Sequence, residues 1–222
     1  MAELPRWARV LVVVAHPDDE SFGLGGVIAA LVDSGAGVRV LCLTAGEAST
    51  LGESEGLAQT RAAELMVAAR ELGAEEALLC HYPDGGLAGC GEALVTEISS
   101  QIARERPDGL LVFCQDGGVT GHPDHEAATI AALTVARAHR IPVLGWGLPR
   151  EVAEVLNQEY SAAFAGHAPT ALPIVLDVDR ERQGRAIAAH ASQAVPGSVL
   201  WRRLELLGSQ EHLRLVTWSD PA

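Results

Sequence analysis

Short runs of apolar residues alternate along this chain with longer segments in which apolar residues recur every three or four positions. The short runs hold Val and Leu at nearly every position, which is typical of strands buried on both faces of a sheet. The longer segments have the spacing of amphipathic helices. The predicted strands are 10–15, 38–43, 77–80, 109–114 and 143–146, and the predicted helices between them are 22–34, 58–72, 92–106 and 122–139.

The regular alternation of strand and helix predicts the fold class. Gly35, Gly73 and Pro107 each follow a predicted helix and are suited to ending it. An alternating pattern of this kind indicates an α/β fold, with a mostly parallel sheet and helices on both faces. We see no linker and no internal repeat, so we expect a single domain over residues 1–222.

The pattern becomes weaker after about residue 148. We expect this C-terminal part to wall the functional site. Its predicted elements are a strand over 172–178, a helix over 180–191, a helix over 198–207 and a strand over 213–218.

Composition excludes several classes of function. The net charge is −13, which disfavours nucleic acid and anionic membrane surfaces as partners. All 16 basic residues are arginine, and the absence of lysine excludes a Walker A phosphate loop and a lysine Schiff base, as in pyridoxal phosphate enzymes. The Gly-x-Gly beginning at Gly23 has Ile28 where a dinucleotide fingerprint needs its third glycine, and no Gly-x-Ser-x-Gly nucleophile elbow occurs.

The cysteines and the apolar runs suggest a location. The four cysteines form no Cys-x-x-Cys pair, and two of them lie in predicted strands, so we expect buried, reduced thiols. No signal peptide is visible, and no apolar stretch is long enough to span a membrane. We therefore predict a cytoplasmic protein without membrane insertion, and we leave homo-oligomer formation open.

Two motifs stand immediately after predicted strands, where open α/β sheets bind ligands. His-Pro-Asp-Asp-Glu occupies residues 16–20, and His-Pro-Asp-His occupies residues 122–125. Proline suits the first turn of a helix and aspartate suits its dipole, so each motif fits an ordinary helix N-terminus. That interpretation does not account for three histidines, because histidine is not a favoured capping residue.

Histidines and carboxylates that meet at one edge of a sheet are typical of a catalytic zinc site, which has three protein ligands and an open position. His16 and Asp19 are three residues apart and would share one face of a helical first turn, which leaves Asp18 free for proton chemistry. His122 and His125 have the same spacing. Zinc is the expected cofactor, and Fe²⁺ also suits such a ligand set.

The two motifs resemble those of the LmbE-like (PIG-L) N-deacetylases, and the resemblance extends from Val10 to Gln193. Further matching segments are Thr-Ala-Gly-Glu at 44–47, Arg-Ala-Ala-Glu at 61–64 with Leu-Gly at 72–73, Tyr-Pro-Asp-Gly at 82–85 and His-Ala-Ser-Gln at 190–193. The resemblance implies a Rossmann-like sheet and a zinc hydrolase that removes acetyl from a small N-acetylglucosaminyl compound.

The resemblance also implies roles for individual residues. His16, Asp19 and His125 would be the metal ligands, and Asp18 would be the general base. His122 would assist the oxyanion or the leaving amine. Asp124 would orient a neighbouring histidine and raise its pKa.

The chain departs from some sugar deacetylases of this family at two places, which puts substrate contacts in doubt. The loop Ala-Ser-Thr-Leu-Gly at 48–52 holds no arginine, and Val-Thr-Gly at 119–121 replaces a tyrosine. Two alternatives stay open: an amidase that cleaves a glucosaminyl conjugate, and a non-catalytic metal-binding Rossmann-like protein. An intact Asp18 disfavours the second. For His190 we weigh a role at a helix end equally against one in the pocket.

Overall fold

The computed structural model describes residues 4–51 and 55–218, so Gly52 and both ends of the predicted domain lie outside the described residues. The strands are β1 (Arg9–Val14), β2 (Gly37–Thr44), β3 (Glu76–Tyr82), β4 (Gly109–Phe113), β5 (Val143–Pro149), β6 (Gly166–His167), β7 (Ile174–Asp177) and β8 (Gln210–Val216). The α-helices are α1 (Gly25–Asp33), α2 (Leu57–Leu72), α3 (Gly91–Glu105), α4 (Pro123–His139), α5 (Arg150–Tyr160), α6 (Glu181–Ala189) and α7 (Val199–Leu207). Short helical turns are η1 (Asp19–Gly23), η2 (Leu87–Gly89), η3 (Asp116–Gly118) and η4 (Pro169–Ala171).

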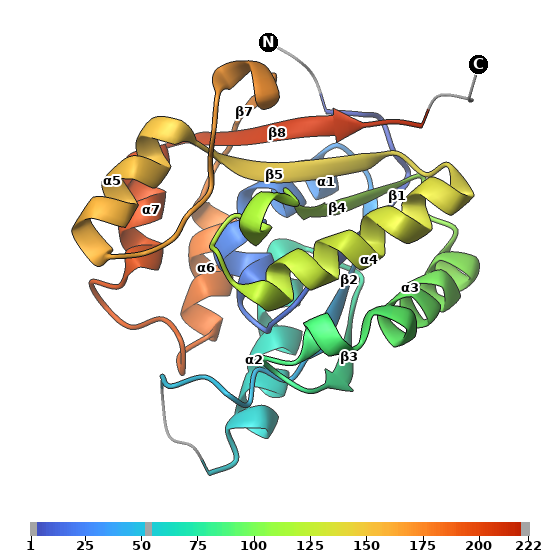
Figure 1. Ribbon diagram of the computed structural model, residues 1–222, viewed down its shortest axis with the longest axis horizontal. Helices are drawn as coiled ribbons and strands as arrows, with labels where there is room; N and C mark the ends of the chain where they lie inside the picture. The colour runs from blue at the N-terminus through green and yellow to red at the C-terminus, as the bar shows by residue number, and fades with distance from the viewer. Residues whose placement is uncertain (1–3, 52–54, 219–222) are drawn as a thin grey trace.

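The strands form one sheet in the order β3-β2-β1-β4-β5-β8-β7, with β6 paired to β5 (Figure 1). The pairs from β3 to β5 are parallel, whereas β8 runs antiparallel to both β5 and β7. This arrangement confirms the predicted mostly parallel sheet. The order also places β1 beside β4, so that the loops after these two strands, which carry the two histidine motifs, meet at one edge.

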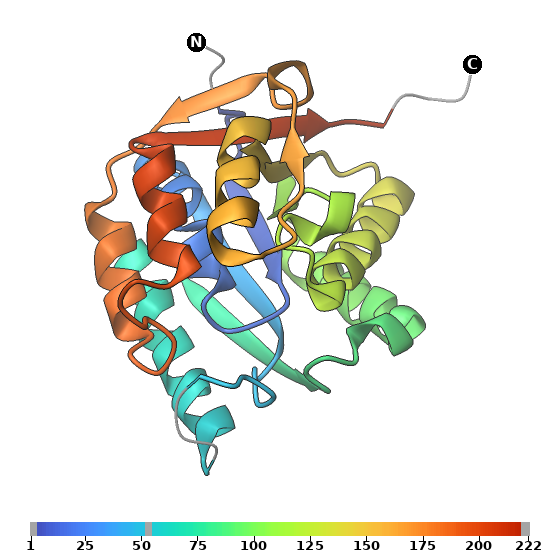
Figure 2. The ribbon, with the colours of Figure 1, turned by 60° about the vertical axis from the view of Figure 1, so that its left-hand side comes forward.

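Two cores lie on opposite faces of the sheet, because successive side chains of a strand point to opposite sides. In β1, Val10, Val12 and Val14 belong to the core that α1 and α2 cover, whereas Leu11 and Val13 belong to the core that α3 and α4 cover. Figure 2 shows α3 and α4 on one side of the sheet and α1, α2 and α6 on the other. The prediction of helices on both faces is confirmed.

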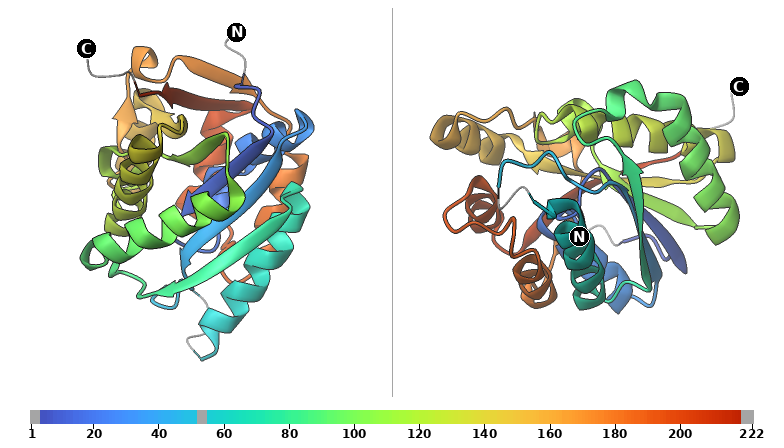
Figure 3. Two further views of the ribbon diagram at one scale, coloured as in Figure 1. Left: turned by 90° about the vertical axis from the view of Figure 1, so that its right-hand side faces the viewer. Right: turned by 90° about the horizontal axis from the view of Figure 1, so that it is seen from below.

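The C-terminal part lies against this framework. α6 packs on α2, and α5 packs on α7 (Figure 3). The sequence pattern predicted α6, α7, β7 and β8 within a few residues of their bounds but missed α5 and the short strand β6. The predicted helix 22–34 begins only at Gly25, because the segment Asp19–Gly23 forms a single π-helical turn before it.

The four cysteines are free, and Cys42 and Cys114 are buried as predicted. Among the residues that the structure describes, no helix is both long enough and apolar enough to cross a membrane. The single domain, the oligomeric state and the absence of nucleic-acid partners stay predictions.

Candidate metal centre

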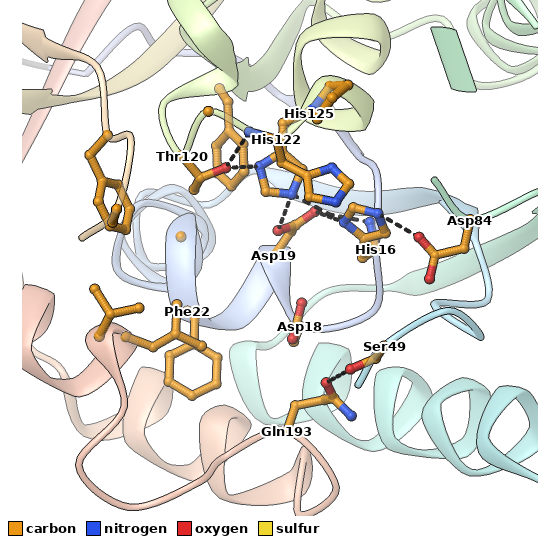
Figure 4. A pocket seen from close by; sticks show the side chains of 18 of the residues that line it. His16, Asp18, Asp19, Phe22, Ser49, Asp84, Thr120, His122, His125 and Gln193 are labelled. Atoms are coloured by element: carbon orange, nitrogen blue, oxygen red, sulfur yellow. Dashed lines mark hydrogen bonds and ion pairs between the residues drawn. The ribbon is translucent and has the colours of Figure 1, made fainter. Parts of the chain in front are cut away.

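A cavity of about 550 Å³ opens at the carboxyl edge of the parallel strands. Residues of both histidine motifs line it, together with residues of the loops after β2 and β3 and of the C-terminal part. Figure 4 shows the side chains of both motifs turned toward one another inside this pocket. The expectation that the C-terminal part walls the site is confirmed.

Three side chains form a compact triangle at the centre of the cavity (Figure 4). His16 Nδ1 lies 3.1 Å from His125 Nε2. Asp19 places Oδ1 3.1 Å from His125 Nε2 and Oδ2 3.6 Å from His16 Nδ1. Metal–ligand bonds of about 2.0–2.1 Å in a tetrahedral zinc site separate the ligand atoms by about 3.3–3.4 Å. These three residues therefore fit a zinc ion in donor chemistry and in spacing.

A turn, rather than a helical face, brings His16 and Asp19 together. Asp19 donates its backbone N–H to the carbonyl of His16 at 3.3 Å, and the backbone N–H of His16 donates to Asp19 Oδ2 at 2.9 Å. The spacing of three residues correctly predicted that His16 and Asp19 lie close together. The prediction that both belong to the first turn of a helix was wrong, because the helix α1 starts later.

Other side chains lie close to the outer nitrogens of the two ligand histidines, and neighbours of this kind orient the rings in metal sites. His125 Nδ1 lies 2.7 Å from Thr120 Oγ1. His16 Nε2 lies 3.0 Å from Asp84 Oδ1 and 3.4 Å from Asp124 Oδ2. Asp124 is therefore placed to orient His16.

In the sequence, Asp84 is noted only as part of a segment that matches the family, and Thr120 only as part of a segment that differs from some of its members. The signal that could have found Asp84 is its place just after a predicted strand.

The carboxylates around the triangle stabilise positive charge there. Burial lowers the pKa of His16, but Asp19 and Asp84 outweigh it and raise that pKa to about 10. Burial likewise acts to raise the pKa of Asp19, and His125 and His16 hold it well below its usual value. A site that favours an extra proton on histidine among ionised carboxylates also favours a divalent cation in place of that proton.

Asp18 lies beside the triangle in an unusual backbone conformation, with φ at 120°. Its Oδ2 is 3.3 Å from Arg61 Nη2, and 18% of its side chain is exposed to the pocket. Arg61 is buried and also donates to the carbonyls of Gly46 and Pro17, which anchors it. Burial raises the pKa of Asp18 to about 6, against the opposing charge of Arg61. Strain of this kind at a functional site is consistent with a positioned carboxylate.

A fully buried pair holds the backbone of Asp18 in place. Glu20 accepts the backbone N–H of Asp18 at 3.0 Å and the hydroxyl of Ser21 at 2.6 Å. His190 Nε2 lies 2.6 Å from Glu20 Oε1, and both side chains are 0% exposed. His190 therefore supports the loop from behind and is not among the residues that line the pocket.

His122 lies at the rim of the triangle. Its ring centroid is 4.8 Å from that of His16 and 5.1 Å from that of His125. Its Nδ1 accepts the backbone N–H of Asp124 at 3.2 Å, so it caps the N-terminus of α4, a role that the sequence had disfavoured for histidine. Burial and the charges of His16 and His125 lower the pKa of His122. Asp124 acts to raise that pKa, as expected, but its effect is smaller than theirs.

His122 is also a second candidate for a metal ligand. Ligand atoms of His16, His122 and His125 all lie within 4.8 Å of one another. Asp19 is the better third ligand, because it is buried and because its charge offsets that of a divalent metal.

We predict that Glu20 and His190 are strongly coupled in the folding free energy. Glu20→Ala leaves His190 buried without its partner, so this variant is expected to lose about 3–5 kcal/mol of stability. His190→Ala is expected to lose a similar amount, and the double variant much less than the sum of the two. Urea unfolding of the four proteins measures the coupling. Losses that add to within about 0.5 kcal/mol would contradict the pairing.

Comparison with known proteins gives consistent results. The profile of the family described as PIG-L, GlcNAc-PI de-N-acetylase, matches residues 11–136. A deacetylase of Streptomyces griseus subsp. griseus, named for 1D-myo-inositol 2-acetamido-2-deoxy-alpha-D-glucopyranoside, is 32% identical over 89% of this chain and 72% of its own.

Two solved structures share the fold. The A40926 pseudoaglycone deacetylase matches with a TM-score of 0.69 and 22% identity over 98% of this chain and all of its own. The 4-carboxy-2-hydroxymuconate hydratase of Pseudomonas putida KT2440 matches with a TM-score of 0.66 and 18% identity over 96% of this chain and 98% of its own. The fold therefore does not by itself select a deacetylase.

Proposed function

Because this chain belongs to the PIG-L (LmbE-like) family of de-N-acetylases, we propose that it is a zinc-dependent hydrolase that removes the acyl group from a small N-acylated amino sugar. The predicted family and the predicted class of enzyme, a metal-dependent N-deacetylase, are confirmed. The observation that carries the proposal is the triangle of His16, Asp19 and His125 with Asp18 beside it in an open pocket.

In this proposal His16 Nδ1, Asp19 and His125 Nε2 hold the metal. Zinc, when bound, polarises an amide carbonyl and promotes the ionisation of water near neutral pH. The residues around it supply the remaining functions. Asp84 and Asp124 hold the ring of His16, and Thr120 holds the ring of His125, so that both histidines keep the tautomer that faces the metal.

Asp18 is the proposed general base. A water molecule that attacks the amide carbon must lose a proton, and the Asp18 carboxylate faces the pocket next to the triangle. Arg61 and Glu20 fix its side chain and its backbone, respectively. A raised pKa of about 6 makes Asp18 a stronger base than an ordinary aspartate while leaving it ionised at pH 7.

His122 is the proposed hydrogen-bond donor to the oxyanion, and the proton that Asp18 takes from water is the one that passes to the leaving amine. Its Nδ1 accepts a backbone hydrogen bond from Asp124, so the neutral ring carries its proton on Nε2. A neutral imidazole with this tautomer donates a hydrogen bond without having to be protonated first. The lowered pKa of His122 favours that neutral form at pH 7.

The sugar part of the substrate is proposed from the relatives, one of which is named for a 2-acetamido-2-deoxy-glucopyranoside of inositol. Residues 48–52 and 119–121 differ from those of some sugar deacetylases in the family. We therefore propose that other residues of this chain contact the sugar. The four free cysteines support a cytoplasmic location for the reaction, since thiols are kept reduced there.

Metal analysis followed by an acetate-release assay tests the proposal. Purified protein is expected to bind about one zinc per chain, because the three ligands define one site. It is expected to release acetate from N-acetylglucosaminyl compounds. This activity is expected to stop after the metal is removed by a chelator and to recover when zinc is added back. Zinc-loaded protein that releases the acyl group from no member of a panel of N-acetyl and longer N-acyl amino sugars would rule the function out.

A further inference from the structure

The pocket has two unlike sides. On one side of Asp18 in Figure 4 lie Ser49, Gln193 and Asp84. These are polar and linked to one another or to backbone: Ser49 Oγ donates to Gln193 Oε1 at 2.8 Å, and Asp84 Oδ2 accepts the N–H of Ala48 at 2.8 Å. A ligand group rich in hydroxyls finds hydrogen-bond partners here.

The other side is an apolar wall, and Phe22 lies on it in Figure 4. Its residues come from η1, from β4 and from the C-terminal part, and they are Phe22, Phe113, Ala162, Phe164, Val199 and Leu200. The ring of Phe113 lies 5.1 Å from that of His125, so the wall starts directly at the metal centre. A charged residue, Arg203, also lines the pocket, but its Nη2 donates to the carbonyl of Phe22 and its guanidinium lies 5.3 Å from the ring centre of Trp146.

Exposed apolar side chains lie next to residues that line the pocket or in the adjoining connection between α6 and α7, and we call this group the rim. Trp201 is 36% exposed and contacts the ring of Phe22 at 5.6 Å. Tyr160 is 39% exposed and bonds to the carbonyl of Gly197, whereas Val195 is 40% exposed in the same connection between α6 and α7. Leu51 is 38% exposed, and Gln193 contacts its carbonyl. Trp201, which contacts Phe22, extends the apolar surface of the wall toward solvent.

We infer that the acyl group removed by this enzyme is a hydrocarbon chain longer than acetyl, held by the apolar wall and the rim. The inference rests on the proposed function. An amide has two substituents, which diverge from the carbonyl at the metal. The hydroxyl-rich sugar matches the polar side, so the acyl chain lies along the apolar wall. Phe22, Phe113 and Phe164 are nearly buried, whereas Ala162, Val199 and Leu200 are partly exposed. An acetyl group would leave these last three in contact with water, which the burial of a longer chain avoids.

A chain-length series tests this inference. We expect kcat/KM of the zinc-loaded enzyme to rise from N-acetylglucosamine through N-butanoyl- to N-hexanoylglucosamine, by about two- to fourfold for each methylene buried. A second series compares the methyl and hexyl glycosides of N-acetylglucosamine, which place the hydrocarbon on the sugar side. In that series we expect no comparable gain.

Variants locate the chain. Leu200→Ser on the wall and Trp201→Ser at the rim are each expected to reduce the hexanoyl-to-acetyl ratio of kcat/KM by about tenfold. Both residues are partly exposed, so the variants are expected to fold. Val67→Ser is the matched control, since Val67 is 47% exposed on α2 and does not line the pocket, and it should leave the ratio unchanged.

The possible failures are distinguishable. If kcat/KM does not change along the N-acyl series while acetate release is normal, the inference is overturned and the proposed function stays intact. A gain confined to the hexyl glycoside also overturns the inference, because it places the hydrocarbon on the sugar side. Release from no compound overturns the proposed function. Binding to zinc-loaded Asp18→Asn, measured by calorimetry, then decides about the wall: tighter binding of the N-hexanoyl than of the N-acetyl compound supports it, and equal binding overturns it.

Discussion

Asp18→Asn is expected to lower kcat by about 10²–10⁴-fold, the usual contribution of a positioned general base, while zinc stays bound. All three proposed ligands remain in this variant. Asparagine has the shape of aspartate and tolerates a positive φ better than most residues, so the unusual conformation at this position can persist. KM should change much less than kcat, because the proton moves only in the transition state.

Three measurements on Asp18→Asn separate the base from a merely structural residue. Bound zinc and the melting temperature show whether the loop and the site are intact, since the change weakens the ion pair with Arg61. Asp33→Asn is a suitable control, because that exposed carboxylate on α1 lies outside the pocket. An Asp18→Asn enzyme with nearly native kcat would remove Asp18 from the mechanism even if the metal site is correct.

His125→Ala is expected to abolish both tight zinc binding and activity. The substitution removes one of three ligands, and it leaves His16 and Asp19 without the nitrogen that lies 3.1 Å from each of them. Two remaining ligands on one short loop hold a divalent metal weakly. Zinc content after dialysis, followed by activity with added zinc, measures the loss.

Two further histidine variants show which residues are ligands. His122→Ala should keep its zinc and lose most of its activity, because His122 is proposed to contact the substrate and not the metal. Loss of zinc from His122→Ala would show that His122, rather than Asp19, is the third ligand. The ligand atoms of His16, His122 and His125 are close enough together for this. His139→Ala, at the exposed end of α4, should change neither property.

Local patterns were sufficient for most of the fold. Runs of Val and Leu such as 10–15 and 109–114 predicted β1 and β4 almost to the residue, because a strand covered on both faces needs apolar side chains at every position. Gly73 ended α2 as predicted, in a left-handed conformation at φ 85°. α5 was missed because it follows directly after β5 without a loop, and Pro149 at the boundary is a weak signal by itself.

The candidate site was predicted in part. Both histidine motifs were recognised from residue types and from their place after strands, and the structure brings His16, Asp19 and His125 together. The roles of these residues stay predictions until the variants are made. The supports were missed: Thr120 and Asp84 hold the ligand histidines, and Glu20 with His190 holds Asp18. The contacts of Asp84 with His16 and of Glu20 with His190 join residues more than 60 positions apart in the sequence. Those of Thr120 with His125 and of Glu20 with Asp18 are local.

The sequence by itself therefore determined most of the elements, the family and the chemical type of the site, since these depend on periodicity and on residue types close together in the chain. Only the tertiary structure decided which groups meet. The pairing of β1 with β4 brings two loops about a hundred residues apart into contact, and the antiparallel β8 returns the C-terminal part to the sheet after α7 has closed the apolar wall. Strand order results from the packing of the whole chain, which no local pattern records.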